Sequence, residues 1–235
     1  MSKENKILIS VVIPAYNEEK HIEACLDSLK KQSFPKLFYE VIVVDNDSTD
    51  KTAEIAKKFQ TKVILETERG TVFAIRKGLN QAQGDIVALT DADTIVNKDW
   101  LKNIYQAFEN NPELVLVGGR TLFRPKVPLS VISQGIFNLA NGLIGFNGAN
   151  GAIRKDTYQR VYGIDEKINL SWETDLSLRL KKEGQKTFLI RNWVITSSRH
   201  FRGWHGIVYC LKGIANTLGV VFLKKSFFFY FGEVR

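Results

Sequence analysis

The chain has 235 residues, of which 44% are hydrophobic and 25% charged, as in an ordinary soluble globular protein with one substantial core. It has no Pro-, Ser- or Gly-rich linker and no repeat, and its polar first residues do not fit a signal peptide. The net charge of +8 suggests attraction to phosphate, but no nucleic-acid-binding motif accompanies it, so we expect no nucleic-acid partner. Cys25 and Cys210 lack metal-binding or redox spacing, and we expect both to be reduced, as in the cytoplasm.

Strands and helices alternate through the first half of the sequence. The β-branched apolar run 7–13 predicts a buried parallel strand, and further strands are expected at 41–44, 63–65, 86–89 and 114–117. Apolar residues spaced three and four apart predict helices at 22–29, 52–59, 72–82 and 101–108. We expect Asn17 to cap the first of these helices and Gly84 to supply a left-handed residue after the third.

The second half is less regular. The sequence predicts an amphipathic helix at 129–144, a tight glycine-rich turn at 148–151 and a helix at 173–183 that stops at Gly184. A tail rich in aromatic residues follows at 207–223 and 227–231. We therefore expect one domain at 1–200, with a regular half at about 1–95 and a less regular half at about 96–200, and a basic, aromatic extension at 201–235.

Three polar clusters are expected to meet at one edge of this domain. The β-α-β order predicts a mostly parallel, Rossmann-like α/β sheet flanked by helices, in which ligands bind beyond the carboxyl ends of the strands. The segments at those ends are Pro14-Ala15-Tyr16-Asn17-Glu18, Asp45-Asn46-Asp47-Ser48 and Asp91-Ala92-Asp93. No Gly-x-Gly-x-x-Gly motif follows the first strand, which argues against a dinucleotide-dependent oxidoreductase.

The third cluster has the chemistry of a metal and diphosphate site. Asp91 and Asp93 are one residue apart in a turn, and Mg²⁺ or Mn²⁺ prefers such oxygen ligands and bridges to diphosphate oxygens. In a second interpretation, one carboxylate holds the metal and the other a ribose. Asp45 lies at a strand tip, where it can accept a hydrogen bond from a nucleotide base. Arg69 and Arg76 are candidates for contact with donor phosphates.

Two later segments carry further candidates. Trp172-Glu173-Thr174-Asp175 opens a helix, where acids favour the helix dipole and where one carboxylate is also a candidate general base. Segment 199–205 mixes cations and aromatic residues. Its guanidinium groups, among them Arg202, suit a diphosphate, whereas its two histidines are better explained as ordinary surface or partly buried histidines than as ligands.

Four of these motifs together resemble those of family 2 glycosyltransferases with the GT-A fold. They span Val12–Glu19, Val43–Thr52, Gly78–Asp93 and Asp175–Leu180 with Gly184, in that order. The resemblance implies an inverting transferase that uses a nucleotide-diphosphate sugar with Mg²⁺ or Mn²⁺. It implies contacts to the nucleotide, the metal and the diphosphate from the following residues: Pro14, Ala15, Tyr16, Glu18, Asp45, Asp91, Ala92 and Asp93.

The resemblance also implies an acceptor side and a catalytic base. The loop at 148–151 resembles the acceptor-side loop of the family, and the acceptor contacts expected here are Asn150, Gly151, Trp172 and Trp204. The family usually has Glu-Asp two residues before the position of Asp175, with that aspartate as base, where this chain has Trp172 and Glu173. We expect Glu173 to be the base, and a one-residue deletion would instead give the role to Asp175.

The C-terminal extension predicts contact with a membrane. Residues 207–223 are at the lower limit for a membrane span and contain Lys212, and Lys224, Lys225 and an aromatic run at 227–231 follow. This composition favours a peripheral anchor on the cytoplasmic face of an anionic membrane, with packing of 207–223 on the core as an equal alternative for that segment. We therefore expect a glycan or lipid-linked acceptor. The alternative function is a catalytically inactive, nucleotide-binding or scaffolding relative, and the oligomeric state is left open.

Overall fold

The computed structural model describes residues 6–165, 167–168 and 170–227. Its strands are β1 (Ile9–Ala15), β2 (Tyr39–Asp45), β3 (Lys62–Leu65), β4 (Ile86–Leu89), β5 (Thr94–Val96), β6 (Leu114–Arg124), β7 (Gly151–Arg154) and β8 (Gln185–Ser197). Its helices are α1 (Ile22–Lys30), α2 (Thr52–Lys58), α3 (Thr71–Gln81), α4 (Trp100–Asn110), α5 (Pro128–Ile144), α6 (Lys155–Arg160), α7 (Trp172–Leu180) and α8 (Gly203–Leu218), with short helical turns η1 (Lys36–Phe38), η2 (Arg199–Phe201) and η3 (Gly219–Leu223).

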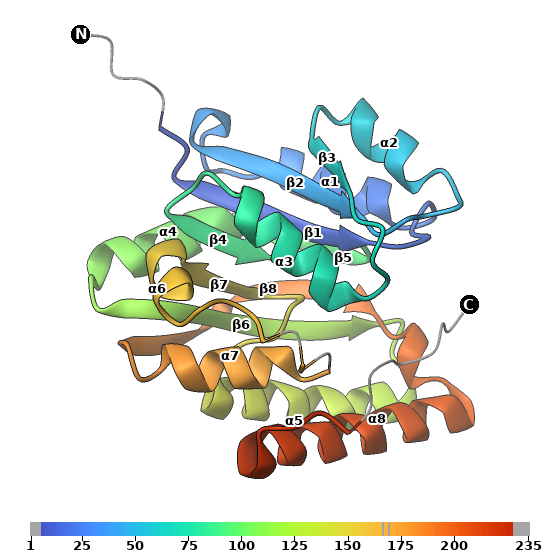
Figure 1. The fold of residues 1–235 in the computed structure, drawn as a ribbon. Coiled ribbons are helices and arrows are strands. Elements are labelled where there is room, and N and C mark those ends of the chain that lie inside the picture. The colour runs from blue at the N-terminus through green and yellow to red at the C-terminus, as the bar shows by residue number, and fades with distance from the viewer. Residues whose placement is uncertain (1–5, 166, 169, 228–235) are drawn as a thin grey trace, which may run out of the picture.

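The strands form one sheet in the order β3-β2-β1-β4-β7-β6-β8-β5, with helices on both faces (Figure 1). In that view α3, α6 and α7 lie in front of the sheet, α1 and α4 lie behind it, and α5 and α8 run side by side below β6. β1 to β4 pair in parallel, as do β6 and β8, while β7 and β5 pair antiparallel with their neighbours. The prediction of a mostly parallel α/β sheet flanked by helices is confirmed.

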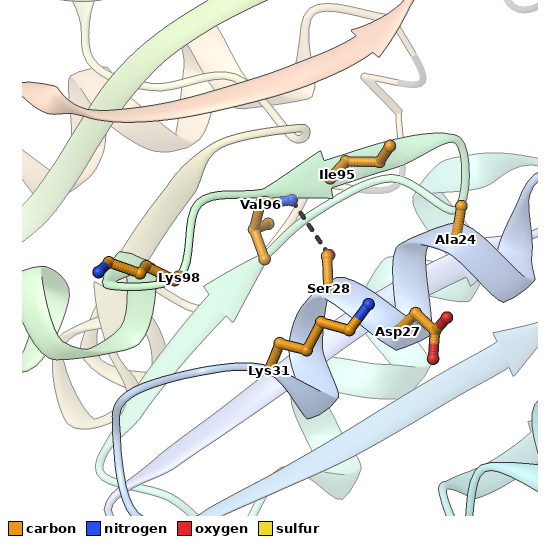
Figure 2. Close-up of a pocket in the computed structure, with 7 residues that line it drawn as sticks. All are labelled: Ala24, Asp27, Ser28, Lys31, Ile95, Val96 and Lys98. Atoms are coloured by element: carbon orange, nitrogen blue, oxygen red, sulfur yellow. Dashed lines mark hydrogen bonds between the residues drawn. The ribbon is translucent and has the colours of Figure 1, made fainter.

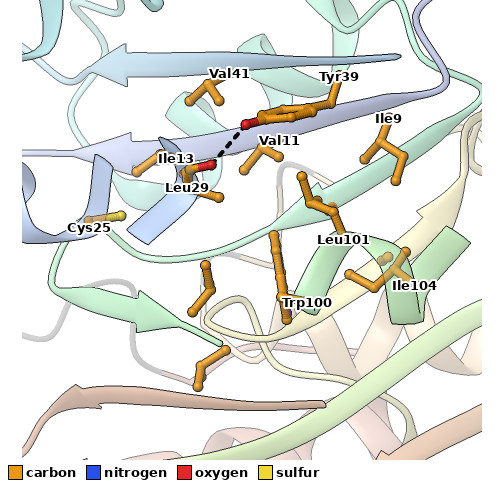
Figure 3. Packing of buried hydrophobic residues seen from close by; sticks show 14 of the residues in the cluster. Ile9, Val11, Ile13, Cys25, Leu29, Tyr39, Val41, Trp100, Leu101 and Ile104 are labelled. Carbon is orange, nitrogen blue, oxygen red and sulfur yellow. Dashed lines mark hydrogen bonds between the residues drawn. The ribbon is translucent and has the colours of Figure 1, made fainter. Parts of the chain in front are cut away.

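Side chains that alternate along β1 build the two core layers. Ile9, Val11 and Ile13 pack on the face covered by α1 and α4, and Val12 packs on the face covered by α3. All four are fully buried, which explains why this strand is a continuous apolar run. The Trp100 ring of α4 stands within the first layer (Figure 3).

Two local expectations were wrong. Asn17 does not cap a helix: α1 begins five residues later, and the Asn17 side chain accepts a hydrogen bond from the Thr49 backbone N–H instead, at 2.9 Å. Gly84 is not a left-handed residue, since α3 ends at an extended Ala82 and the positive-φ glycines of the described chain do not include it. A Cβ at Gly84 would lie 2.7 Å from the Ser10 backbone nitrogen, so close strand packing requires the glycine.

The second half contains elements that the sequence did not predict. β5, α6 and the long strand β8 were not expected, and the helix expected at 173–183 ends at Leu180 with a turn before β8 begins at Gln185. The turn expected at 148–151 is present at residues 147–150, and Gly151 is the first residue of β7. The aromatic residues expected at 228–231 lie outside the described part of the chain.

Candidate active site

Four carboxylates from three parts of the chain interact electrostatically at the carboxyl edge of the sheet. Glu18 follows β1, Asp91 and Asp93 follow β4, and Glu173 lies in the first turn of α7. We call these four residues the acidic cluster. A parallel sheet places the loops after β1 and β4 at the same edge, and this geometry explains how residues so distant in sequence meet.

Asp91 shows the strongest effect of this arrangement. Burial raises its pKa, and the charges of Asp93, Glu173 and Glu18 raise it further, to about 8, against the lowering effect of Arg199. A divalent cation would neutralise this concentrated negative charge, so the two aspartates fit a metal. No group of three or more potential metal ligands was found among the described residues. A Mg²⁺ or Mn²⁺ ion held by Asp91 and Asp93 would therefore take further oxygens from a diphosphate.

Glu173 and Asp91 face the same backbone position, Gly148. A Cβ built on Gly148 would lie 3.4 Å from Glu173 Oε1, 3.5 Å from Trp172 Cζ2 and 3.9 Å from Asp91 Oδ1. The glycine therefore keeps open the space between the two carboxylates. Burial raises the pKa of Glu173, and a hydrogen bond from the Gly148 backbone N–H partly offsets this rise. The raised pKa makes the Glu173 carboxylate a better proton acceptor.

Asp175 belongs to a different environment. It is buried, and its Oδ2 accepts a hydrogen bond from Arg179 Nε at 2.8 Å. Arg179 also donates to the carbonyl oxygens of Val161 and Gly163, at 2.5 and 2.7 Å. This ion pair ties α7 to the loop after α6, so the structure gives Asp175 a structural partner and does not support it as the base.

Asp45 has the chemistry expected of a residue that recognises a nucleotide base. It is 6% exposed at the end of β2, and its buried Oδ1 has no hydrogen-bond partner within the described chain. The neighbouring Asn46 side chain donates to the carbonyls of Glu66 and Glu68 and accepts from the Gly70 N–H, at 3.0, 2.7 and 2.8 Å. These bonds hold loop 66–70 beside Asp45, and an N–H from a ligand would satisfy the buried oxygen.

The two predicted arginines lie around this loop. Arg69 belongs to this loop, and its guanidinium stacks over the Tyr16 ring, 5.1 Å from the ring centroid, so it joins the loop to the segment after β1. Arg76, in the middle of α3, lies over the Phe73 ring at 5.6 Å. The structure therefore places Arg69 in the loop beside Asp45, the candidate contact for the nucleotide base, whereas Arg76 lies on α3.

The nucleotide-side loop after β1 is pinned to the loop after β2. The Glu18 backbone N–H donates to Thr52 Oγ1 at 2.7 Å, and the Asn17 N–H donates to Ser48 Oγ at 3.0 Å. Ala15 and Ala92 are both buried, with exposures of 3% and 2%. Pro14, the residue before Ala15, is partly exposed at the same strand end.

The cation of the cluster is Arg199, which the sequence did not single out. Its guanidinium forms a bidentate ion pair with Glu18 and lies 3.3 Å from Asp93 Oδ2. Arg202, the expected diphosphate contact, is solvent-exposed at the start of α8. The only sequence signal was the basic segment itself, because which of its arginines turns inward depends on η2.

The acceptor-side predictions fare differently. Asn150 is 1% exposed and its amide is used internally, since it accepts from Trp100 Nε1 at 2.8 Å and donates to the carbonyls of Arg120 and Asn192. Gly151 lies in β7, where the Phe146 ring occupies the position of a side chain. Both residues therefore shape the loop from within, and an acceptor contact by either one stays a prediction.

The two tryptophans remain candidates for the acceptor side. Trp172 is 5% exposed and packs edge-to-face on Phe146, with ring centroids 5.9 Å apart, and its Cζ2 lies beside Gly148 at the cluster. Trp204 is 73% exposed at the start of α8. Of the two histidines nearby, His200 stacks on Tyr209 at 5.1 Å and His205 is exposed.

A separate groove lies on the other side of the sheet edge. It runs between α1 and β5, from Lys31 to Lys98 (Figure 2). Within it, Ser28 Oγ accepts a hydrogen bond from the Val96 N–H at 3.1 Å, which joins the two elements. None of the acidic-cluster residues lines this groove. The acidic cluster is therefore the candidate active site, and this groove is separate from it.

A mostly parallel sheet whose carboxyl edge gathers carboxylates and a buried, unsatisfied oxygen is typical of a nucleotide-binding α/β domain. The model of the family described as "Glycosyl transferase family 2" matches residues 10–171, more than half of the chain. The chain therefore belongs to glycosyl transferase family 2.

The relatives are similar over part of their length. The chain is 38% identical over 133 residues to the poly(ribitol-phosphate) beta-N-acetylglucosaminyltransferase TarS of Staphylococcus aureus, a stretch that covers 53% of this chain and 23% of TarS. It is 34% identical over 122 residues to the dolichyl N-acetyl-alpha-D-glucosaminyl phosphate 3-beta-D-2,3-diacetamido-2,3-dideoxy-beta-D-glucuronosyltransferase of Methanococcus voltae, covering 47% of this chain and 38% of that enzyme. The chain thus spans well under half of these relatives.

Solved structures share the fold over nearly the whole chain. The mannosyltransferase PcManGT of Pyrobaculum calidifontis, in complex with GDP-Man and Mn²⁺, superposes with a TM-score of 0.75 at 22% identity, covering 92% of this chain and 64% of that one. TarS residues 1–349 in complex with UDP-GlcNAc superpose with a TM-score of 0.71 at 21% identity, covering 95% and 68%. The fold is the GT-A fold of these transferases.

Proposed function

We propose that the protein is an inverting glycosyltransferase that moves a sugar from a nucleotide-diphosphate sugar, such as a UDP- or GDP-sugar, to an acceptor hydroxyl. The observation that carries the proposal is the convergence of Asp91 and Glu173 on Gly148, which joins a diphosphate-binding carboxylate and a base across one small space. Its family membership and the nucleotide sugars bound by two structural neighbours support the same reaction class.

The donor half of the proposal uses residues 1–95. Asp45 accepts the N–H of the base, Tyr16 and Arg69 flank it, and the backbone at Pro14, Ala15 and Ala92 closes around the nucleotide. A Mg²⁺ or Mn²⁺ ion held by Asp91 and Asp93 would supply positive charge to the departing diphosphate. Arg199, already beside Asp93, adds a guanidinium that suits the same oxygens.

The acceptor half, at about 96–200, supplies the base. Glu173 takes the proton of the attacking hydroxyl on its carboxylate, and the hydroxyl oxygen attacks the anomeric carbon from the face opposite the leaving diphosphate, which inverts the configuration. Burial raises the pKa of Glu173 toward working pH, while the Gly148 N–H holds the carboxylate in place. Trp172 and Trp204 are the acceptor contacts that we retain.

The acceptor that we propose is a lipid-linked or cell-envelope glycan, reached from the cytoplasmic face of the membrane. Two relatives carry such acceptors in their names, a dolichyl phosphate and a poly(ribitol-phosphate). The extension at 201–235 would serve as a peripheral contact with that membrane. It has one helical stretch, Gly203–Leu223, that is long and apolar enough to cross a membrane by length and composition alone.

Two measurements test the proposal. A ligand at 100 times its Kd stabilises the folded chain by about 2.7 kcal/mol, which is roughly 5–10 °C in a domain of this size, so UDP or GDP should raise the melting temperature, and more so with Mn²⁺. Glu173→Gln should keep that shift and lower sugar transfer by roughly 10²–10⁴-fold. Nucleotide binding without transfer by the wild-type chain would favour the alternative, a catalytically inactive nucleotide-binding or scaffold protein.

A further inference from the structure

Helix α5 turns its polar side to the domain and its apolar side outward, the reverse of a helix that covers a hydrophobic core. Its polar side chains face the domain: Gln134 accepts a hydrogen bond from the Phe123 N–H at 3.0 Å, and Asn138 exchanges two bonds with the Thr121 backbone at 2.8 and 2.9 Å. Its aliphatic side chains face outward, with exposures of 63–66% at the following positions: Ile132, Ile136, Leu139 and Leu143. Surface helices normally turn such a stripe inward.

Helix α8 continues this apolar surface. The two helices run side by side (Figure 1) and touch where Ser133 Oγ lies 3.6 Å from Cys210 Sγ. The outward stripe of α8 is exposed by 42–73% at the following positions: Trp204, Ile207, Leu211, Ile214 and Leu218. We call these nine side chains, four on α5 and five on α8, the α5–α8 face. A contiguous apolar patch across two helices marks an interaction surface.

The charges around this face identify its occupant. No charged residue occurs in the sequence from Val127 to Ile153, which contains all of α5. No acidic residue occurs between Glu183 and Glu233, whereas this stretch carries Lys212, Lys224 and Lys225. The two helices thus carry no acidic residue, and their apolar surface together with these lysines is complementary to a bilayer with anionic headgroups.

Helix α8 is tied to the domain along its inner side, so it lies on the domain instead of crossing a bilayer. Gly206 has no room for a side chain, because its Cβ would lie 2.5 Å from the Phe201 carbonyl carbon. Asn216 is fully buried, and the Oγ1 of the neighbouring Thr217 lies 3.4 Å from Ser171 Oγ, next to the start of α7. The inner side also lies beside the acidic cluster, since the Tyr209 ring stacks on His200 with ring centroids 5.1 Å apart, and the residue before His200, Arg199, lies 3.3 Å from Asp93 Oδ2.

From these contacts we propose that the α5–α8 face docks flat on a bilayer containing anionic lipids, so that the inner side of α8 closes the acidic cluster while its outer side lies in the headgroup layer. This proposal rests on the proposed membrane contact and makes it more specific, because it assigns the contact to α5 as much as to the C-terminal extension. A lipid-linked acceptor would then meet Glu173 from the edge of the membrane.

Flotation of the full chain with vesicles tests the docking. The probes are vesicles of phosphatidylcholine alone and of equal parts phosphatidylcholine and phosphatidylglycerol. Wild type should float with the anionic vesicles, and Ile136→Glu with Leu139→Glu should weaken that binding roughly tenfold or more, since two aliphatic side chains that would enter the bilayer become charged. Leu37→Glu, a matched change at a side chain that is 62% exposed on η1, should bind like wild type.

The outcomes separate this proposal from the proposed function. Melting temperature and its shift with UDP or GDP are measured on each variant, and the α5 double variant should keep both while losing vesicle binding. Wild type that stays unbound at low salt, or a double variant that floats like wild type, overturns the docking whatever the nucleotide result. A wild-type dimer that the α5 variant converts to monomer, without vesicle binding, also overturns it and assigns the face to a second copy.

Discussion

The sharpest test of the active-site geometry is to add one methyl group at Gly148. The backbone angle φ of Gly148 lies outside the left-handed region, and every neighbour of the added Cβ is at 3.4 Å or more, so alanine fits without overlap. Replacing a loop glycine whose backbone suits alanine stabilises a protein by about 0.4–1 kcal/mol, through the unfolded state. We therefore expect Gly148→Ala to fold as well as wild type.

Its effect on transfer should be large. The methyl group would sit 3.4 Å from Glu173 Oε1 and 3.9 Å from Asp91 Oδ1, in the space where the acceptor hydroxyl meets the donor. A displacement of the reacting group by about 1 Å costs roughly 100-fold in rate. The expected result is therefore a loss of about 100-fold in kcat/KM for the acceptor, with donor binding retained, since neither Asp45 nor Arg69 contributes one of the three atoms nearest to the added methyl group.

The assay is release of nucleotide diphosphate from the donor in the presence of acceptor, with thermal melts in parallel. Gly142→Ala on α5 is the matched control, because nothing lies within 4 Å of its added Cβ, and its turnover should equal that of wild type. A Gly148→Ala enzyme that melts normally and turns over within twofold of wild type would show that the reaction does not pass between Glu173 and Asp91.

Three further changes probe the charges of the site. Asp91→Asn should raise the melting temperature above wild type near pH 8 and leave it unchanged below pH 3.8. The pKa of Asp91 rises from 3.8 to about 8 on folding, so the wild-type protein loses stability as the pH rises through that interval, and the variant does not. Thermal melts across this pH range check the sign. Arg199→Ala should lower the free energy of unfolding, measured in urea, by about 1–3 kcal/mol, because it leaves buried carboxylates unpaired. Arg202→Ala, at an exposed side chain, should lower it by no more than about 0.5 kcal/mol. Asp175→Asn should lower stability through its Arg179 pair while the folded enzyme keeps its turnover, and a turnover loss as large as that of a base variant would contradict that assignment.

The sequence by itself determined the sheet and its edge. Strand period and apolar run length are local properties, so the runs at 7–13 and 86–89 specify buried parallel strands, and the polar residues that follow them must meet at the carboxyl edge. Asp45, Asp91 and Asp93 were found in this way because their positions follow from chain direction alone.

Only the tertiary structure decided which side chains face the site. Glu173 and Asp175 are two positions apart on a helix with 3.6 residues per turn, so they point in nearly opposite directions, and the packing of α7 turns Glu173 toward Gly148. The same reasoning applies to Arg199 and Arg202, separated by the turn of η2, and to Asn150, whose amide was taken by Trp100. Likewise the apolar stripe of α5 faces outward because the amides on its other side bind the β6 backbone at Thr121 and Phe123, which lies beyond the part of β6 that pairs with β7. The helix's own sequence does not contain this partner.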